Sequence, residues 1–372
     1  MQKKDSDNNS RFREKNQTME TNSNNDFLTL HLEVFGHKAS VPCHKAKQGQ
    51  CKCKILNQLT KDTTVSQRTK TRHHKKDIKI IQNTQVTLSD KEILPSKYKD
   101  LLKAYIFDFS KPLGSGGNGT VYPAKRRSDN LSVVVKQIPK SGTKIEIDLL
   151  SEVKFLKRLR GVNGIVQIID YCDSPQDYLI VMDTMDNCMD LFSFLNNQDL
   201  LYEDTIHYIF KQTIVAVETC LRKGIVHTDL KTENIIINTM THNIKLIDFG
   251  GSKTARYGHY KNFSGTIHYA PPEVLVQNIY TAQGIISWTM GTILYKMVCG
   301  DIPFSKPNEI FEKYENYEKD MTTDIISTRQ KEISSSCIHL ITKCLQRQEK
   351  FRYKVNQIRA HAWVQYGKHT DV

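Results

Sequence analysis

The sequence predicts an α+β fold with two unlike lobes, a small one rich in β-strands and a larger helical one, behind a polar N-terminal tail. Three observations support this prediction. Residues 1 to about 90 are rich in Asn, Lys, Gln, Ser and Thr. From Tyr105 onward, strand-like apolar runs alternate with turn residues, and after Pro271 the apolar spacing is mostly helical. Strands early in a chain and helices late are typical of an α+β fold.

The positive charge of the chain is concentrated in the tail. The 372 residues carry a net charge of +13, of which residues 1–104 contribute +10 through 21 Lys and Arg against 11 Asp and Glu. We therefore expect residues 1–104 to be a basic, mostly disordered tail. The alternative is a surface for acidic partners: a phosphoprotein, a membrane surface or, as the weakest option, nucleic acid.

Three short segments of the tail suggest local functions. Residues 27–35 alternate apolar and polar side chains, which allows a strand, a marginal hairpin or a docking segment, although no neighbouring segment offers an obvious matching face. Cys43, His44, Cys51 and Cys53 could bind zinc, but their spacing fits no strong zinc pattern, so free thiols are favoured. Residues 70–76 could form a weak nuclear import patch.

The composition disfavours secreted and membrane-spanning proteins. No run approaches the roughly 18 apolar residues that a membrane helix needs, and residues 1–10 lack the apolar core of a secretory signal. Nine cysteines, an odd number without an export signal, favour free thiols in a reducing compartment. We expect a monomer without a membrane span, located in the cytoplasm, the nucleus or both.

The regular part of the chain predicts two lobes, at about residues 105–183 and 184–366. The first should contain strands at residues 113–122, broken by a glycine-rich turn, and at 132–138 and 178–182, with a helix at 145–159. The second should begin with helices at residues 191–195 and 203–223 and remain mostly helical. The charged residues 311–325 are expected to be a surface loop.

The turn at residues 114–121 reads Gly-Ser-Gly-Gly-Asn-Gly-Thr-Val. Because glycine has no Cβ, its backbone can approach a phosphate group closely, which suits a loop that covers a nucleotide. Alone this is a weak signal, since a mobile glycine hairpin explains the same residues.

A lysine and a glutamate follow the glycine turn at suggestive positions. Lys136 ends the apolar run at residues 133–135, 22 positions after Gly114, which could place it beneath the turn. A lysine buried there needs an acidic partner, and Glu152 in the next predicted helix can supply one. The alternatives are a lysine that reaches the surface along an apolar stem and a solvated helix charge.

The segment His-Thr-Asp-Leu-Lys-Thr-Glu-Asn at residues 227–234 is the most informative. It follows the long predicted helix and precedes an apolar strand, so Asp229, Lys231 and Asn234 lie in one short loop between core segments. For this loop alone, a solvated polar turn is the alternative.

Two further motifs follow at the same end of the chain. Ile-Asp-Phe-Gly, which contains Asp248, comes directly after an apolar strand, and Ala-Pro-Pro-Glu ends at Glu273. Each of these alone is more often an ordinary turn.

All six motifs occur in the order found in protein kinases, and the chain resembles that family over about residues 105–365. Any one of them could arise by chance, but not all six in order. Within the family the chain is most similar to the Pim group of serine/threonine kinases. The matching stretches are 113–117, 190–192, 245–250, the Pro-Pro-Glu segment and the unusually specific Met-Val-Cys-Gly-Asp-Ile-Pro-Phe at 297–304. The resemblance implies a bilobal protein-kinase-like fold.

The resemblance also implies an activity, that of a non-specific serine/threonine protein kinase which uses ATP and Mg²⁺ to phosphorylate protein substrates. Asp229 would accept the proton of the substrate hydroxyl, and Lys231 would steady the γ-phosphate. Lys136, paired with Glu152, would hold the α- and β-phosphates.

The metal and nucleotide sites are implied in the same way. Asn234 and Asp248 would be the Mg²⁺ ligands. Backbone groups near Asp183 and Met185 would bind adenine, with Met182 as the gatekeeper. The complete implied nucleotide-binding set is Leu113, Gly114, Ser115, Gly116, Gly117, Asn118, Gly119, Val121, Val134, Lys136, Met182, Asp183, Met185, Asp190 and Ile236.

The sequence departs from the kinase pattern at five positions. Thr228 replaces the arginine that usually grips an activation-loop phosphate, so we expect activity that such a phosphate does not gate. Val134 replaces an alanine over the adenine and Asn118 replaces an aromatic residue at the loop tip, which could weaken ATP binding and phosphate shielding. Ile286 stands where most kinases place an aspartate that anchors the catalytic loop. Met185 replaces the hinge proline of Pim kinases and adds an N–H donor.

The substrate preference implied by the resemblance is for basic segments. Pim kinases favour basic peptides, and the acidic Asp190, Glu233 and Asp301 are present here, whereas Lys296 stands where an acid is expected. We therefore expect a weakened basic preference. The alternative for each carboxylate is a solvated surface charge.

Two rival functions stay open at this point. The changes at Thr228, Val134 and Asn118 allow a pseudokinase, a nucleotide-binding or scaffolding module with slow or no turnover. The presence of every charged catalytic group disfavours it. A weaker alternative makes the basic tail a nucleic-acid or membrane tether for an active kinase.

Overall fold

The computed structural model describes residues 28–34, 37–43, 96–117, 119–140, 145–174, 176–198, 201–307, 309–312, 317–329 and 332–370. The chain divides into two units, at residues 1–86 and 87–372. Each unit is described by itself below.

The first unit contains one β-hairpin. Strand β1 (Leu28–Val34) pairs antiparallel with β2 (His37–Cys43), with Leu28 opposite Cys43 and Val34 opposite His37. Of the three possibilities left open for residues 27–35, the structure has the hairpin, and the partner strand is a seven-residue segment that the apolar pattern did not reveal. The zinc hypothesis, the import patch and the disorder expected for the rest of the tail lie outside the described residues and side chains.

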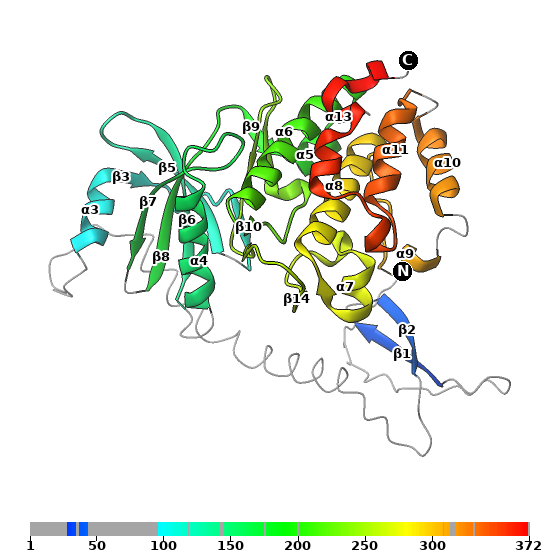
Figure 1. Ribbon diagram of the computed structural model, residues 1–372. Helices are drawn as coiled ribbons and strands as arrows, with labels where there is room; N and C mark the ends of the chain where they lie inside the picture. The colour runs from blue at the N-terminus through cyan, green and yellow to red at the C-terminus, as the bar shows by residue number, and fades with distance from the viewer. Residues whose placement is uncertain are drawn as a thin grey trace, which may run out of the picture. The chain divides into compact units, whose positions relative to one another are not determined.

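The second unit begins with a six-stranded antiparallel sheet in the order β3-β5-β6-β8-β7, with β4 paired to β5 (Figure 1). The strands are β3 (Tyr105–Phe107), β4 (Gly114–Gly116), β5 (Gly119–Arg126), β6 (Ser132–Pro139), β7 (Ile168–Asp173) and β8 (Asp177–Asp183). Helix α4 (Ile145–Arg158) belongs to the same lobe. The strands and the helix expected for the first lobe are thus confirmed.

The period-two pattern of β6 and β8 gives the sheet two apolar faces. Val133, Val135, Leu179 and Val181 lie in a small core and are each exposed by 2% or less. The alternate residues face a larger core, which contains Leu156 of α4 and continues into the second lobe. Successive side chains of a strand point to opposite faces, so one β-branched run serves both cores.

Helix α3 (Ser96–Ala104) precedes the sheet and packs against it. Leu101 is only 2% exposed and belongs to the small core of the sheet, and Ala104 O accepts a hydrogen bond from Arg127 N at 2.8 Å. Residues 96–104, which belong to the expected tail, therefore form a helix that packs on the sheet. The charged residues of the segment 96–104 favour a tail, although its spacing is also compatible with a helix.

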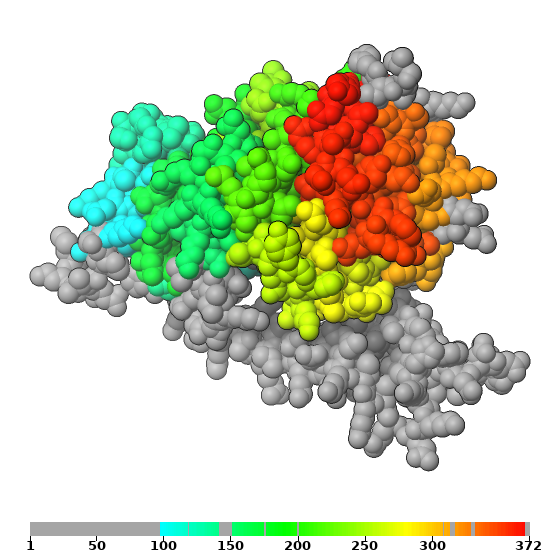
Figure 2. Space-filling model, in the orientation of Figure 1, coloured from blue at the N-terminus to red at the C-terminus, as the bar shows by residue number. Residues whose placement is uncertain are grey.

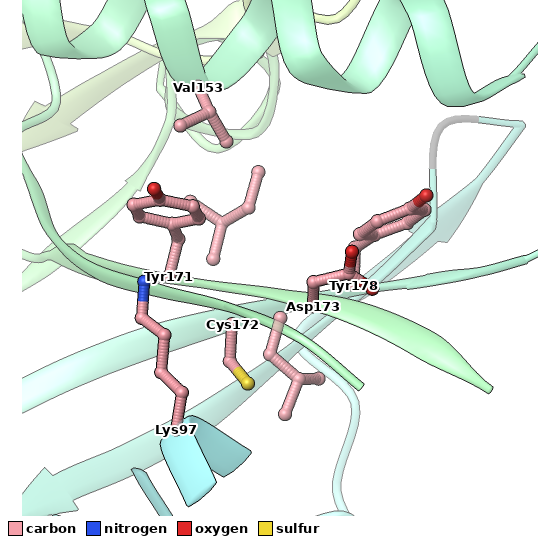
Figure 3. A pocket seen from close by; sticks show the side chains of 8 residues that line it. Lys97, Val153, Tyr171, Cys172, Asp173 and Tyr178 are labelled. Carbon is pink, nitrogen blue, oxygen red and sulfur yellow. The ribbon is translucent and has the colours of Figure 1, made fainter. Parts of the chain in front are cut away.

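A cavity of about 290 Å³ lies where α3, α4, β7 and β8 meet (Figure 3). Lys97 reaches from α3 to the ring of Tyr171, with its Nζ 3.7 Å from the ring centre. Lys157 of α4 lies 4.1 Å from the same ring centre. Lys157, with help from Lys97, lowers the pKa of the Tyr171 hydroxyl. Val153 lines the cavity from the side of α4.

The second lobe is mainly helical, as expected. Its helices and 3₁₀ turns are α5 (Leu191–Asn196), α6 (Glu203–Arg222), η1 (Thr232–Asn234), η2 (Ile267–Tyr269), α7 (Pro272–Gln277), α8 (Ala282–Cys299), α9 (Glu309–Glu312), α10 (Tyr317–Arg329), α11 (Ser335–Cys344), η3 (Glu349–Phe351), α12 (Val355–Ala360), α13 (Ala362–Tyr366) and η4 (Gly367–Thr370). Its short strands are β9 (Cys188–Asp190), β10 (Ile225–Val226), β11 (Ile235–Asn238), β12 (Ile244–Leu246), β13 (Lys253–Thr254), β14 (Tyr260–Lys261) and β15 (Ile279–Tyr280).

Helix α8 forms the centre of this lobe. All of its residues except Gln283 and Cys299 are buried, and it contacts α6, α10, α11 and α12.

The C-terminal residues, red in Figure 2, cover part of the helical lobe, where α13 packs against α6. No helix in the described part of the chain is long and apolar enough to cross a membrane.

The expectation of a surface loop at residues 311–325 is wrong over most of its length. Residues 317–329 form α10, in which Met321 and Ile325 are 0% exposed. Tyr317 donates its hydroxyl to Leu345 O at 2.6 Å, and burial raises the pKa of this tyrosine. The charged residues suggested a loop, but two apolar side chains one turn apart are enough to dock a helix on a core.

The place of α3 in the domain can be tested with two adjacent leucines. Leu101→Ala should lower the free energy of unfolding by about 2–5 kcal/mol, because it leaves a cavity in the core of the sheet. Leu102 is 37% exposed, so Leu102→Ala should change it by no more than about 0.5 kcal/mol. Urea unfolding of the three proteins measures both values. Equal effects of the two substitutions would mean that α3 does not contribute to the core.

Candidate active site

Lys136 forms the centre of a buried charge cluster. Strand β6 carries it, and its Nζ lies 2.9 and 3.0 Å from the two carboxylate oxygens of Glu152 on α4. The same Nζ lies 2.8 Å from Oδ1 of Asp248, which follows β12 in the second lobe. The expected pair of Lys136 and Glu152 is therefore present, and the lysine also joins the two lobes through Asp248.

Burial and charge act in opposite directions on this cluster. Lys136 is 5% exposed and Glu152 2% exposed. Burial acts to lower the pKa of Lys136, but Glu152 and Asp248 outweigh it, so that its pKa is raised and the ammonium stays charged. Burial raises the pKa of Glu152, while the lysine opposes that shift. A buried charge of this kind is tolerated only with close partners in good geometry.

The backbone after β12 turns sharply at the Asp-Phe-Gly motif. Asp248 has a left-handed φ of 59°, which aspartate tolerates better than most residues. Phe249 is fully buried and meets the ring of His227 edge to face at 4.9 Å. Nε2 of His227 donates to Ile247 O at 3.0 Å, and burial lowers the pKa of this imidazole, which is therefore neutral. The motif is thus held in one conformation by packing and by the loop that contains Asp229.

Both carboxylate oxygens of Asp229 are engaged. Oδ1 accepts hydrogen bonds from the Thr266 N–H at 2.7 Å and from its hydroxyl at 2.8 Å. Oδ2 lies 3.2 Å from Nδ2 of Asn234 and 3.3 Å from Nζ of Lys231. Lys231 also donates to the Thr266 hydroxyl at 2.8 Å. Lys231 and Asn234 of the expected catalytic loop therefore surround the Asp229 carboxylate, together with Thr266 from a distant segment.

Comparison with known proteins agrees with this geometry. A model of the protein kinase domain matches residues 107–364, which is more than half of the chain. The chain belongs to the protein kinase family.

Two relatives indicate where this kinase lies within the family. It is 35% identical over 294 residues to the serine/threonine-protein kinase pim-2 of Danio rerio, covering 75% of this chain and 91% of that one. It is 33% identical over 260 residues to the serine/threonine-protein kinase prk-2 of Caenorhabditis elegans, covering 68% of this chain and 56% of that one. The resemblance to the Pim group is confirmed.

A more distant relative shows the same catalytic domain in a longer chain. The kinase is 31% identical over 268 residues to the SNF-related serine/threonine-protein kinase of Rattus norvegicus, which covers 70% of this chain but 35% of that one. The similarity therefore covers about a third of that longer chain.

The residues at the expected metal site suit Mg²⁺. Nδ2 of Asn234 donates to the Asp229 carbonyl at 2.8 Å, so its amide oxygen faces away from that bond and can bind a cation. Asp248 supplies a carboxylate whose side chain is 27% exposed. The described part of the chain has no group of three or more His, Cys, Asp or Glu that could hold a metal ion. Mg²⁺ commonly binds through one or two carboxylates and completes its shell with water and substrate phosphates, which fits this small set.

The sheet register brings the expected nucleotide-binding residues together from several strands. Val121 of β5 lies opposite both Gly114 of β4 and Lys136 of β6. Val134 lies opposite Met182, next to Asp183 at the end of β8. In the second lobe, Ile236 of β11 lies opposite Asp190 of β9. Asn118 is outside the described residues.

Two details of this region have a direct physical explanation. Gly119 has a φ of 116°, and a Cβ there would lie 2.5 Å from Gln137 O, so only glycine fits where the glycine turn meets β6. The Asp183 carboxylate accepts hydrogen bonds from the Lys245 ammonium at 2.5 Å and from the Gln167 N–H at 2.7 Å. These bonds fix the end of β8, where adenine is expected to bind. Met185 is not proline and keeps an N–H for the base.

Three residues that support the site were missed from the sequence. Thr266 holds Asp229, as described above. A Cβ on Gly265 would lie 2.5 Å from Thr228 O, so glycine allows the Thr266 segment to approach the catalytic loop. Arg352, 4% exposed, donates to Glu273 from Nη1 at 2.8 Å and Nη2 at 3.0 Å. The Gly-Thr pair shortly before Pro-Pro-Glu was the only local signal for the first two, and nothing local identified the arginine.

The importance of the Thr266 hydroxyl can be tested directly. Thr266→Val removes a hydrogen bond to the Asp229 carboxylate and the acceptor of Lys231, at a cost of about 1.5–3 kcal/mol for charged partners. We expect kcat/KM for peptide phosphorylation to fall roughly 10- to 100-fold. Thr266→Ser keeps the hydroxyl and should retain most of the activity. An unchanged kcat/KM in Thr266→Val would mean that the hydroxyl and its hydrogen bonds are not needed.

Proposed function

We propose that this chain is an active serine/threonine protein kinase that transfers the γ-phosphate of Mg·ATP to hydroxyl groups of protein substrates. The observation that carries the proposal is the contact of Lys136 with both Glu152 and Asp248. The lysine that we expect to bind the phosphates thus contacts the carboxylate that we expect to bind Mg²⁺, and such an arrangement would support phosphoryl transfer.

The residues of the catalytic loop supply the remaining roles. Asp229 would accept the proton of the substrate hydroxyl and orient that hydroxyl toward the phosphorus. Lys231, 3.3 Å from Asp229, would neutralise charge on the transferred phosphoryl group. Asn234 and Asp248 would hold Mg²⁺, which offsets the negative charge of the phosphates. Catalysis of this reaction is mostly positioning and charge stabilisation, so a preformed set of contacts is what matters.

A pseudokinase is the alternative, and the contact geometry disfavours it. Val134 pairs with Met182 without a break in the register, so the larger side chain is accommodated in the sheet. Before pairing, burial of the charges on Lys136, Glu152 and Asp248 costs several kcal/mol per ion. A scaffold without turnover has no need for such a buried charge cluster.

We also propose that no activation-loop phosphate is needed. Thr228 donates its hydroxyl to Gly251 O at 2.5 Å, so this position already bonds the activation segment without a phosphate. Lys253 of the same segment donates to Asn262 O at 3.0 Å and to the Tyr280 hydroxyl at 2.8 Å. These bonds can order the segment without the arginine that a phosphate would require.

Aromatic packing adds to the order of the activation segment. The rings of Tyr260 and Tyr280 stack at 5.3 Å, and Phe263 meets Tyr280 edge to face at 5.7 Å. Tyr260 also donates its hydroxyl to Thr254 O at 3.0 Å and accepts from Arg256 N at 3.0 Å. Such contacts can order the segment without a phosphate group.

A preference for basic segments near the target is the last part of the proposal. Glu233 is half-buried beside Asn234 and bonds only to the neighbouring Thr232 hydroxyl among the described side chains, at 3.0 Å. Asp301 is exposed. Asp190 caps α5 by accepting hydrogen bonds from the N–H and the hydroxyl of Ser193. Carboxylates with open hydrogen-bonding capacity can receive arginine or lysine side chains of a substrate.

Phosphate transfer from Mg·ATP to an arginine-rich serine peptide tests the enzymatic proposal. We expect transfer by the wild type and a loss of about 100-fold or more in Asp229→Asn and Lys136→Met, because each removes a charge used in the transition state. Lys125→Met and Asp204→Asn, at exposed positions of β5 and α6, are the matched controls and should stay active. A wild type no faster than the two site variants, with ATP binding seen by thermal shift, would identify a pseudokinase.

Phosphatase treatment tests the independence from an activation-loop phosphate. The fully dephosphorylated kinase, checked by intact mass, should keep its kcat/KM within about twofold, because Thr228 offers no receptor for a phosphate. A large loss of activity that returns on rephosphorylation would contradict this expectation.

A further inference from the structure

Lys296 on α8 differs from the other buried charges of the domain. Five charged side chains are buried in the described part of the chain: Lys136, Glu152, Glu203, Lys296 and Arg352. Four of them have hydrogen-bonded partners, namely the Lys136–Glu152 pair, Arg352 with Glu273, and Glu203 with Ser334 and the Trp363 indole. In the described part of the chain, the Lys296 side chain makes no hydrogen bond or ion pair. It contacts the ring of Phe192, with its Nζ 4.6 Å from the ring centre.

A ring contact does not compensate a buried ammonium. Lys296 is 5% exposed, and removing an ammonium from water costs several kcal/mol, whereas a cation–π contact returns about 0.5–2 kcal/mol. The Nζ atom of Lys296 is not fully enclosed, so the ammonium reaches the surface beside Phe192. The side chain is therefore a buried stem with a charged tip that can accept a counter-charge.

The tip of Lys296 lies on the side of the second lobe that carries the catalytic loop. Phe192 is in the first turn of α5, two residues after Asp190, whose strand pairs with β11. Helix α5 packs against η1, which contains Glu233 and follows the loop of Asp229. Helix α8 also contacts η2, the turn directly after Thr266. A protein substrate that presents its hydroxyl to Asp229 passes close to these elements.

We propose that Lys296 is a specificity residue which binds an anionic side chain of the substrate, a carboxylate or a phosphate, at one position near the phosphorylated hydroxyl. The proposal rests on the kinase function proposed above and deepens it. An anionic group would form a charge-assisted hydrogen bond with the ammonium, and an arginine at the same position would be repelled. Because Glu233 and Asp301 are proposed above to receive basic side chains, the preferred segment would carry both signs of charge.

A purely structural role for Lys296 predicts different behaviour. If its four-carbon stem only fills space beside Phe192, the charge at its tip has no effect on substrate choice. Lys296→Met keeps an unbranched apolar stem and removes the charge, whereas Lys296→Glu reverses the charge. The two variants together separate packing from electrostatic recognition.

The test uses the full chain and labelled serine peptides that keep two arginines and carry Glu, phosphoserine, Gln or Arg in turn at each of the five positions before the serine. Binding is measured by fluorescence anisotropy with Mg²⁺ and a non-hydrolysable ATP analogue, and kcat/KM is measured in parallel. For the wild type we expect about tenfold tighter binding of the Glu peptide than of the Arg peptide at one position. The phosphoserine arm shows which anion is preferred there.

The variants should change this ratio in a defined way. Lys296→Met should bring it close to one, and Lys296→Glu should invert it at the same position only. Lys350 is an exposed lysine whose Nζ lies 4.7 Å from the ring centre of Phe351, so Lys350→Glu is a matched control that should keep the wild-type ratio. A ratio within about twofold of one at every position, or one that Lys296→Glu leaves unchanged, overturns the proposal. Selective binding without turnover would contradict only the enzymatic function.

Discussion

The contact of one ammonium with two carboxylates is the interaction on which this structure depends. Lys136, Glu152 and Asp248 come from a strand, a helix and the turn after another strand, so their contact fixes three elements of two lobes at once. The cluster has one net negative charge, which suits a site that must attract a divalent cation. Removing Lys136 would leave two carboxylates without compensation, and breaking a buried ion pair in this way costs about 3–5 kcal/mol. Function and lobe orientation therefore share one set of atoms.

A second layer of contacts holds the catalytic loop without any added group. Thr266 satisfies Asp229 through its N–H and its hydroxyl, and the absence of a side chain on Gly265 permits that approach. The buried pair of Arg352 with Glu273 anchors the end of the same segment to the helical lobe. In this kinase, hydroxyl groups, backbone N–H groups and one buried ion pair thus hold the catalytic loop and the segment that follows it.

The parts of the fold and site that are local in sequence could be predicted, and the rest depended on tertiary contacts. Asp229, Lys231 and Asn234 lie within six residues, so their loop brings them together in any fold that buries its flanks. Thr266 and Arg352 are 37 and 79 positions from Asp229 and Glu273, and no spacing rule connects them. The positions assigned to nucleotide binding follow from the strand order, but the residues themselves were known only through family resemblance.

Two errors about the fold have the same physical origin. The charge of residues 96–104 and of 311–325 suggested solvated segments, yet Leu101 and the pair Met321 and Ile325 are buried. A short helix needs only one or two apolar side chains on one face to dock, while its charged residues remain in water. Composition averages over both faces and therefore cannot detect such helices.

The packing of α3 also affects how the catalytic domain would behave if it were cut from its tail. The small core beneath α3 contains Tyr105, Val133, Val135, Leu179 and Val181 in addition to Leu101. A chain shortened to begin at residue 105 would expose this sheet face as a continuous apolar surface, and such surfaces promote self-association. Low solubility of a shortened kinase would then reflect a missing cover on the sheet and would say nothing about its catalytic residues. A cut before residue 96 preserves that cover.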